Sequence, residues 1–480
     1  MRVPFLLFIY LTAISEIANA QDLSCSSAVT LDGGTLEVTS DNSGDDTENL
    51  QCALDFAIEA GFRDIFLTSK TYNVGAVSAT GFRGDLRGRS KKNTVVSIRN
   101  GALSCTEAMG AAIEFQVGNA SVRNMTISVD SPCADGNAAS VIAFHSNSAD
   151  CADRTVFGNV DRVVIAGTGT QGSDTVVGII ADVAPGCDSA NQRVLGTLKV
   201  NRSELSDLEI GVQTSIGGGG QVDINYNSLS TIGLPLSILD ANQSTTILAN
   251  KINFNDVDSY GASSGLGTTA IYVASTAASP NNNTTTIKNN TFTDGGLSAA
   301  GTAILVGQVE KAITHKMAVT GNTFQGSSAN TAGGGLVAID TEDGVISGNA
   351  FLSAAGTWID VSSGDMSQGF IGRDISGWAI VANDFSGSTA NTDISLGEGT
   401  SGVIVGRSQG FPKVDDVTGE NDILESYTAS NTAFAKRTRS VRSAAAPTEL
   451  FYKQLLTLMR LDPLNDYARS RKRLTESSRG

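Results

Sequence analysis

Three aspartates, Asp340, Asp360 and Asp393, have the residue type and spacing that could support chemistry. They lie within or next to short apolar strand segments. These segments share a pair of apolar residues that we assign to the interior: Ile271/Val273, Ile304/Val306, Val337/Ile339, Ile359/Val361 and Ile394/Leu396. Because side chains alternate between the two faces of a strand, the residues between and beside each pair should point outward. The predicted outward row contains the three aspartates together with Tyr272 and Trp358.

This row fits two kinds of chemistry. Successive aspartates are one rung and two residues apart in this alignment, which places their backbones roughly 8 Å apart. Carboxylates about 6.5–9.5 Å apart leave room for a water molecule and suit inverting glycoside hydrolysis. A row of aspartates with backbone carbonyls could instead hold calcium as a cofactor. Trp358 and Tyr272 would add flat apolar faces on which sugars stack. The alternative is that these aspartates are ordinary solvent-facing residues of an acidic protein.

Two other features do not support the chemistry that they suggest. Residues 167–172 fit the pattern G-x-G-x-x-G, but residues 174–180 read as a strand. A dinucleotide site needs a helix N-terminus there to bind pyrophosphate. His145 and His315 are isolated in the sequence, and a lone histidine is more often a surface or turn residue than a catalyst.

The elements that must position the row come from a repeat of asparagine, any residue and a large apolar residue. It occurs as Asn227/Leu229, Asn250/Ile252, Asn290/Phe292, Asn322/Phe324, Asn349/Phe351 and Asn383/Phe385. The asparagines are 23, 40, 32, 27 and 34 residues apart, as in solenoid repeats. Asparagine tolerates a left-handed turn conformation and can bond to stacked copies of itself, while the apolar residue enters the core. The repeat therefore predicts a solenoid whose unequal spacing is taken up by loops.

A helix is predicted ahead of the rungs. Residues 45–48 offer an N-cap, Gly61 ends the pattern, and the apolar residues between them are at helical spacing: Leu50, Ala53, Leu54, Phe56, Ala57 and Ala60. A helix laid over the first rung would cover an exposed apolar edge.

Residues 44–54, with Gly44-Asp45-Asp46-Thr47 leading into Leu50-Gln51 and Ala53-Leu54, resemble the opening helix of pectin-lyase-like proteins. Residues 81–88 and 92–96 are similar to the first coil of that superfamily. The resemblance implies an all-β fold, a single-stranded right-handed parallel β-helix, over most of the mature chain. We expect it to carry an N-terminal capping helix and a C-terminal helical tail. A shared fold does not imply a shared function.

One motif resembles a more specific group of that superfamily. Asn391-Thr392-Asp393, with Asp415-Asp416 downstream, is similar to two motifs of polygalacturonases. The Gly-His-Gly and Arg-x-Lys motifs of those enzymes are missing. We therefore do not infer polygalacturonase activity.

The N-terminus predicts export. Arg2, the apolar residues 5–11 and Ala18-Asn19-Ala20 form a signal peptide over residues 1–20. No segment is long enough to span a membrane. We expect a secreted protein, periplasmic in a Gram-negative host. Export favours disulfides, and all cysteines lie in the first 187 residues: Cys25, Cys52, Cys105, Cys133, Cys151 and Cys187.

The charge is unevenly distributed. A net charge of −16 argues against binding nucleic acid, because phosphate contacts need Lys and Arg. Residues 436–480 carry eleven Lys/Arg and four Asp/Glu, a net +7, which leaves −23 for the rest. This tail contains a predicted helix that Pro463 ends, with apolar residues Leu450, Phe451, Leu455, Leu458 and Met459. Either the helix closes the end of the solenoid, or the tail is cleaved or docks on a surface.

The sequence thus predicts four parts: the signal peptide (1–20), a cap and first coil (21–100), a β-helix (101–430) and a basic tail (431–480). The leading hypothesis for function is a secreted polysaccharide-acting protein, either hydrolase or lyase, which works as a monomer on a polysaccharide or cell-surface glycan. The alternative is a non-catalytic carbohydrate-binding or adhesion solenoid. An enzyme should have a groove with convergent acids or bases, whereas a binding module should present a flat ladder.

Overall fold

The computed structural model forms two compact units, which are described separately. Unit 1 comprises residues 1–188 and 196–208, and unit 2 comprises residues 189–195 and 209–480. The predicted signal peptide and the predicted basic tail lie outside the described residues. Within the described part, no helix is long and apolar enough to cross a membrane. The described residues are 25–40, 44–68, 70–103, 110–133, 139–147, 149–151, 155–167, 176–183, 195–215, 220–239, 244–254, 269–275, 283–294, 302–308, 315–326, 334–339, 343–353, 356–362 and 375–424.

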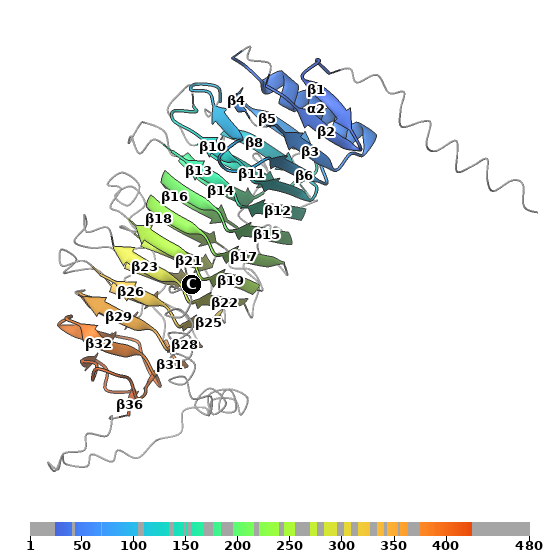
Figure 1. Ribbon diagram of the computed structural model, residues 1–480. Helices are drawn as coiled ribbons and strands as arrows, with labels where there is room; N and C mark the ends of the chain where they lie inside the picture. The colour runs from blue at the N-terminus through green and yellow to red at the C-terminus, as the bar shows by residue number, and fades with distance from the viewer. Residues whose placement is uncertain are drawn as a thin grey trace, which may run out of the picture. The chain divides into compact units, whose positions relative to one another are not determined.

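Unit 1 is built from parallel strands stacked rung upon rung in two sheets, A and B (Figure 1). A strand β1 (Val29–Asp32) pairs antiparallel with β2 at its start. Sheet A contains β2 (Thr35–Val38), β3 (Asp64–Leu67), β6 (Asp85–Gly88), β9 (Ala120–Arg123), β12 (Thr155–Asp161) and β15 (Leu195–Asn201). Sheet B contains β4 (Thr71–Val74), β5 (Val77–Thr80), β7 (Val95–Ile98), β8 (Gly110–Gln116), β10 (Thr126–Ser128), β11 (Ala139–His145), β13 (Val164–Ala166), β14 (Val176–Asp182) and the start of β16 (Glu204–Thr214).

Unit 2 repeats the same plan, and its strands lie side by side from green to orange in Figure 1. Its sheet A contains β17 (Gln221–Asn225), β19 (Ser244–Leu248), β22 (Asn283–Lys288), β25 (His315–Thr320), β28 (Gly344–Ser347), β31 (Trp378–Val381), β34 (Ile404–Val405) and β36 (Asp422–Ile423). Its sheet B contains β18 (Ser228–Leu239), β20 (Lys251–Phe254), β21 (Thr269–Ser275), β23 (Thr291–Asp294), β24 (Thr302–Gln308), β26 (Thr323–Gln325), β27 (Gly334–Ile339), β29 (Ala350–Ser353), β30 (Thr357–Ser362), β32 (Asp384–Ser388), β33 (Thr392–Leu396) and β35 (Val414–Asp416). The predicted parallel β-helix is confirmed.

The repeated asparagines form a buried ladder where each rung of unit 2 turns from sheet A to sheet B. Asn322 shows the pattern. Its Nδ2 donates to Asn349 Oδ1 at 3.0 Å and to the carbonyl of Ile287 at 2.9 Å, and its backbone N–H donates to the same Asn349 Oδ1 at 2.9 Å. Asn290 in turn donates to Asn322 Oδ1. Such stacking satisfies every hydrogen-bonding group of a buried amide.

The left-handed turn falls on the residue before each ladder asparagine, not on the asparagine itself. Tyr226, Ala249, Asn289, Gly321, Gly348 and Ala382 have φ between 55° and 66°. The ladder asparagine is then free to hold the turn by its side chain. Beyond the turn, Phe292, Phe324, Phe351 and Phe385 stack at 4.8–4.9 Å between ring centroids. The predicted entry of the apolar residue into the core is therefore confirmed.

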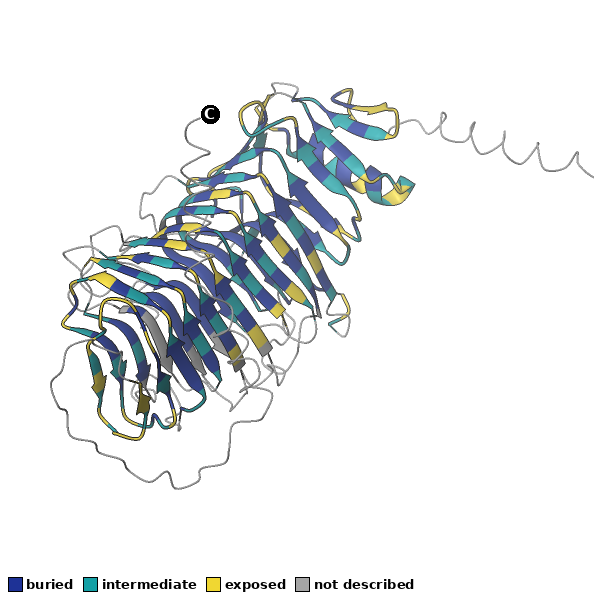
Figure 2. Cartoon of the chain, turned by 60° about the horizontal axis from the view of Figure 1, so that its bottom comes forward, coloured by how far each residue is buried: buried dark blue, intermediate teal, exposed yellow. Residues whose placement is uncertain are grey.

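Buried and exposed residues alternate along the strands (Figure 2). The inward pairs Ile271/Val273 and Ile304/Val306 are in register, as are Ile359/Val361 and Ile394/Leu396. The predicted pair Val337/Ile339 is wrong by one residue, because Leu336 pairs with Ile304 and Ile359, and Ala338 pairs with Val306 and Val361. Residues 336–339 are all apolar, so the sequence there has no polar residue to fix its phase.

The cap helix α2 (Thr47–Ala60) ends at Gly61, which is left-handed, as predicted. It closes the first rung of unit 1 by supplying side-chain partners to backbone amides. Asn73 N–H donates to Asp46 Oδ2 at 3.0 Å, and Gly75 N–H donates to Thr47 Oγ1 at 2.7 Å. Gln51 accepts from the N–H of Ser78 at 2.9 Å and donates to its carbonyl at 2.8 Å. These bonds occupy groups that a bare sheet edge would leave open.

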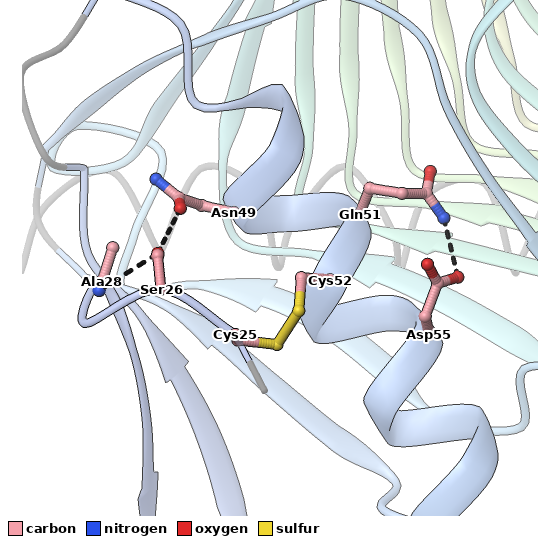
Figure 3. The surroundings of a disulfide bond; sticks show 7 residues. All are labelled: Cys25, Ser26, Ala28, Asn49, Gln51, Cys52 and Asp55. Carbon is pink, nitrogen blue, oxygen red and sulfur yellow. Dashed lines mark hydrogen bonds between the residues drawn. A yellow bond between two sulfur atoms is a disulfide. The ribbon is translucent and has the colours of Figure 1, made fainter. Parts of the chain in front are cut away.

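A disulfide fastens the cap helix to the residues before β1. Cys25 and Cys52 are joined, with Cα atoms 5.7 Å apart (Figure 3). Cys133 and Cys151 each take part in a disulfide, whereas Cys105 and Cys187 lie outside the described residues. The prediction of disulfides in the N-terminal third is confirmed for the four described cysteines.

Candidate functional site

Asp360 occupies the outward position that the sequence predicts. It lies between the buried Ile359 and Val361 and pairs with Val337 on one neighbouring rung and Ser395 on the other. Burial raises the pKa of the Asp360 carboxyl, and a hydrogen bond with Ser395 opposes that rise. Asp340 lies outside the described residues. The pairing of β27 is also offset by one residue from the alignment that the sequence suggested. The alternation used to predict an outward position for Asp340 therefore does not hold on this strand.

Asp393 and Trp358 are not exposed, contrary to prediction. Asp393 retains 4% of its exposed surface and Trp358 retains 3%. The indole Nε1–H of Trp358 donates to Ser388 Oγ at 2.9 Å, and the Ser388 hydroxyl donates to Asp393 Oδ1. Asp393 Oδ2 accepts the backbone N–H of Lys413 at 2.9 Å. This chain of bonds, together with packing of Trp358 against the Phe351 ring at 5.4 Å, fits a structural role better than contact with a ligand.

Tyr272 also differs from the predicted sugar-stacking face. It alternates with the inward Ile271 and Val273, but only 7% of its surface is exposed. Each carboxylate oxygen of Asp393 already accepts a hydrogen bond, and calcium binding by this row stays a prediction. No group of three or more His, Cys, Asp or Glu side chains that could hold a metal occurs within the described residues. The catalytic roles assigned to Asp340, Asp360 and Asp393 stay predictions.

A prediction for Asp360 follows from its raised pKa. The folded state binds the Asp360 proton more tightly than the unfolded state does, so this contribution to stability is present at low pH and is lost as pH rises. Asp360→Asn should therefore gain stability relative to wild type at pH 7 and not at pH 3, in urea unfolding. Asp415→Asn is the matched control, because Asp415 is exposed in the same column of the sheet. An equal difference at both pH values would contradict the burial of the charge.

His145 is buried and paired, so its interpretation as an isolated surface or turn residue is wrong. Its Nδ1 lies 2.8 Å from Glu114 Oε1, and Gln116 donates to the same oxygen at 2.9 Å. Burial acts to raise the pKa of Glu114, but hydrogen bonds from His145, Gln116 and Ser78 lower it overall. The register places His145 beside Gln116 on β8 and Asp182 on β14. One turn of the solenoid separates Glu114 from His145, which is why reading either residue alone missed the pair.

A groove of about 610 Å³ crosses the sheet A side of unit 1. Its lining comes from four neighbouring rungs, those of β3, β6, β9 and β12: Arg63, Arg83, Gly84, Asp85, Gly118, Asn119, Ser121 and Phe157. A Cβ at Gly84 would lie 2.3 Å from the carbonyl oxygen of Arg63, and one at Gly118 would lie 2.2 Å from that of Phe82. The two glycines therefore allow the rungs to approach closely and leave bare backbone along the groove.

The arginines of this side fall into two groups. Arg87 pairs with Asp64, Arg123 with Asp85 and Arg202 with Asp161, each at 2.7 Å and each reaching back one rung. The hydrogen bond and charge of Arg87 hold the pKa of Asp64 below its usual value. Arg63 and Arg83 are exposed, and no carboxylate of the described residues pairs with either of them. The groove thus has two guanidinium groups available to a ligand, beside Phe157, whose side chain is 40% exposed.

No protein-family model and no curated protein matches the chain. Among solved structures, the chain is similar to a mannuronan C-5 epimerase A-module from Azotobacter vinelandii, with 15% identity and a TM-score of 0.43 over 82% of this chain and 96% of that one. It is similar to the catalytic domain of a GH87 α-1,3-glucanase, with 10% identity and a TM-score of 0.42 over 82% and 69%. It is also similar to a surface adhesin of Streptococcus pneumoniae, with 11% identity and a TM-score of 0.34 over 79% and 90%. The strand register of the chain itself carries the fold assignment.

Proposed function

We propose that this protein is an exported β-helix that binds an acidic polysaccharide in the arginine-lined groove of unit 1. The observation that carries the proposal is the pair of exposed arginines, Arg63 and Arg83, without carboxylate partners in a protein of net charge −16. Three other arginines of the same side are neutralised by aspartates. A guanidinium left free beside them is suited to a carboxylate or sulfate, which it can bind through two parallel hydrogen bonds.

The remaining lining suits a sugar polymer. The exposed Asn119 offers a side-chain amide to hydroxyls, and Phe157 offers an apolar ring face to a pyranose. Parallel rungs repeat about every 4.8 Å, so an extended chain can meet similar groups on successive rungs. A nucleic acid is a poor alternative, because it is bound through many phosphate contacts from Lys and Arg, and the groove lining offers two arginines. Export is supported by the predicted signal peptide and by the disulfides of the described cysteines.

An enzymatic role, as lyase or hydrolase, is the second candidate. The Glu114–His145 pair favours it, because a carboxylate on Nδ1 orients an imidazole for proton transfer at Nε2. Gln116, which lies beside His145 in the register, is separated from the groove residue Gly118 by one residue. A site at Asp360 would be separate from the Glu114–His145 pair, because Asp360 belongs to unit 2 and the pair belongs to unit 1.

A binding and activity screen tests both candidates. The purified protein is measured against carboxylated, sulfated and neutral polysaccharides, with and without calcium, and product release is followed in parallel. We expect binding to acidic polymers that weakens as salt is raised. The protein should come from a host that does not glycosylate, because Asn119 begins an Asn-Ala-Ser sequon in the groove. Binding to neutral polymers alone would contradict the proposal, and binding without product would favour the non-catalytic module.

A further inference from the structure

The last rung of unit 2 leaves apolar side chains in solvent. Phe411, Val417, Ile423 and Leu424 are 63%, 61%, 42% and 58% exposed. These are four of the seven large apolar side chains that are exposed within the described residues, and they fall within residues 411–424. We call them the end patch. Concentrated exposure of this kind marks a surface that is normally covered.

The end patch exists because the solenoid stops. Ile423 pairs with Val405, which is 2% exposed and itself pairs with the fully buried Ile380. Ile423 therefore continues a column of inward side chains and has no further described rung above it. In sheet B, the last described strand, β35, ends in side-chain hydrogen bonds and not in an exposed apolar residue of the inward column. Asp416 follows Leu396 in register and accepts hydrogen bonds from Thr418, Gly419 and Asn421.

The first rung of unit 1 shows what a solenoid end requires. There α2 covers the first rung with its buried face of Leu50, Ala53, Leu54 and Ala57, and its side chains bond to free strand amides. An uncovered terminal rung exposes both apolar surface and backbone groups. The end patch lacks such a cover within the described residues.

We propose that residues 447–463 of the same chain cover the end patch. Leu450, Phe451, Leu455, Leu458 and Met459 are spaced to form one apolar face of a helix. The described chain stops at Leu424, inside the patch, so the segment is tethered to its own binding surface by residues 425–446. These 22 residues reach up to about 75 Å when extended, and the tether gives the segment a high effective concentration.

Charge supports this occupant over a second copy of the acidic unit. Residues 396–424 hold five carboxylates (Glu398, Asp415, Asp416, Glu420 and Asp422) and two cations (Arg407 and Lys413), a net of −3. The tail, residues 436–480, has eleven Lys/Arg and four Asp/Glu, a net of +7. Two copies of the end patch would repel each other, whereas the tail is attracted to it.

Hydrogen exchange of the full-length chain tests the proposal, read at Asp422 and Leu424, whose N–H groups bond to the carbonyls of Val403 and Val405. Leu458→Asp places a charge on the apolar face of the segment and should speed exchange at both amides by about tenfold or more. Thr457→Asp is the matched control, because it adds the same charge on a different face and should leave exchange unchanged.

A second variant places the contact at the end patch. Leu424 is exposed, so Leu424→Asp should leave the rungs folded. Adding Leu458→Asp to this variant should then raise the exchange rate little further, because the effects of two residues in contact are not additive. Unchanged exchange in Leu458→Asp would overturn the proposal. So would a dimer whose dissociation on dilution deprotects the same amides, because a second copy would then be the occupant.

Discussion

Replacing Asn322 by Asp is expected to destabilise unit 2 by about 3–5 kcal/mol, as for a buried charge without a partner. Asn322 is 1% exposed, and its Nδ2 donates to two acceptors, the Ile287 carbonyl and Asn349 Oδ1. Aspartate has no donor at that position. It would direct a second oxygen, carrying negative charge, against both acceptors. The substitution is nearly the same size, so the loss measures the hydrogen bonds and the charge rather than packing.

Asn253→Asp is the matched control. Asn253 lies on β20 directly after the buried Ile252, but its side chain is exposed. It should change stability by less than about 0.5 kcal/mol, as surface substitutions generally do. The measurement is urea unfolding followed by circular dichroism for both variants and wild type. Equal losses in the two variants would mean that the ladder adds nothing beyond the general effect of an added charge.

The double substitution Arg63→Gln/Arg83→Gln is expected to weaken binding of an acidic polysaccharide by about 100-fold, because each charge-assisted hydrogen bond contributes about 1.5–3 kcal/mol. Both arginines are exposed and make no ion pair with a described carboxylate, so folding should be unaffected. Glutamine keeps a hydrogen-bond donor and removes the charge. The variant should also lose most of the salt dependence of binding.

The control for the groove is Lys92→Gln, which removes one positive charge from an exposed residue of unit 1 that does not line the groove. Its affinity for the same polysaccharide should stay within about twofold of wild type, since exposed charges beyond about 10 Å are largely screened at 0.1 M salt. Calorimetric titration at two salt concentrations gives both quantities. Equal losses in the control and the double variant would indicate binding by overall charge and not by the groove.

The sequence by itself determined the features that repeat or are local. The spacing of Asn290, Asn322 and Asn349 predicted a solenoid, since each turn must bring the same residue to the same buried corner. The helix that ends at Gly61 was predicted because helical spacing and its stop signal lie within a few residues of each other. The inward pair Ile359/Val361 was found for the same reason: the polar residues Asp360 and Ser362 fix which positions of the strand face inward.

Only the tertiary structure decided which residues meet across rungs. The all-apolar run at Leu336 left two phases open, and pairing with the neighbouring strands chose between them. Alternation along the strands predicts that Trp358 and Asp393 face outward, yet both are buried. Both form hydrogen bonds with Ser388. Glu114 and His145 are 31 residues apart in sequence, and Arg63 and Arg83 reach one groove from different rungs. The lengths of the loops decide how far apart in sequence two contacting residues lie, and these lengths vary from rung to rung. Contacts between rungs therefore follow from the three-dimensional register and not from spacing along the chain.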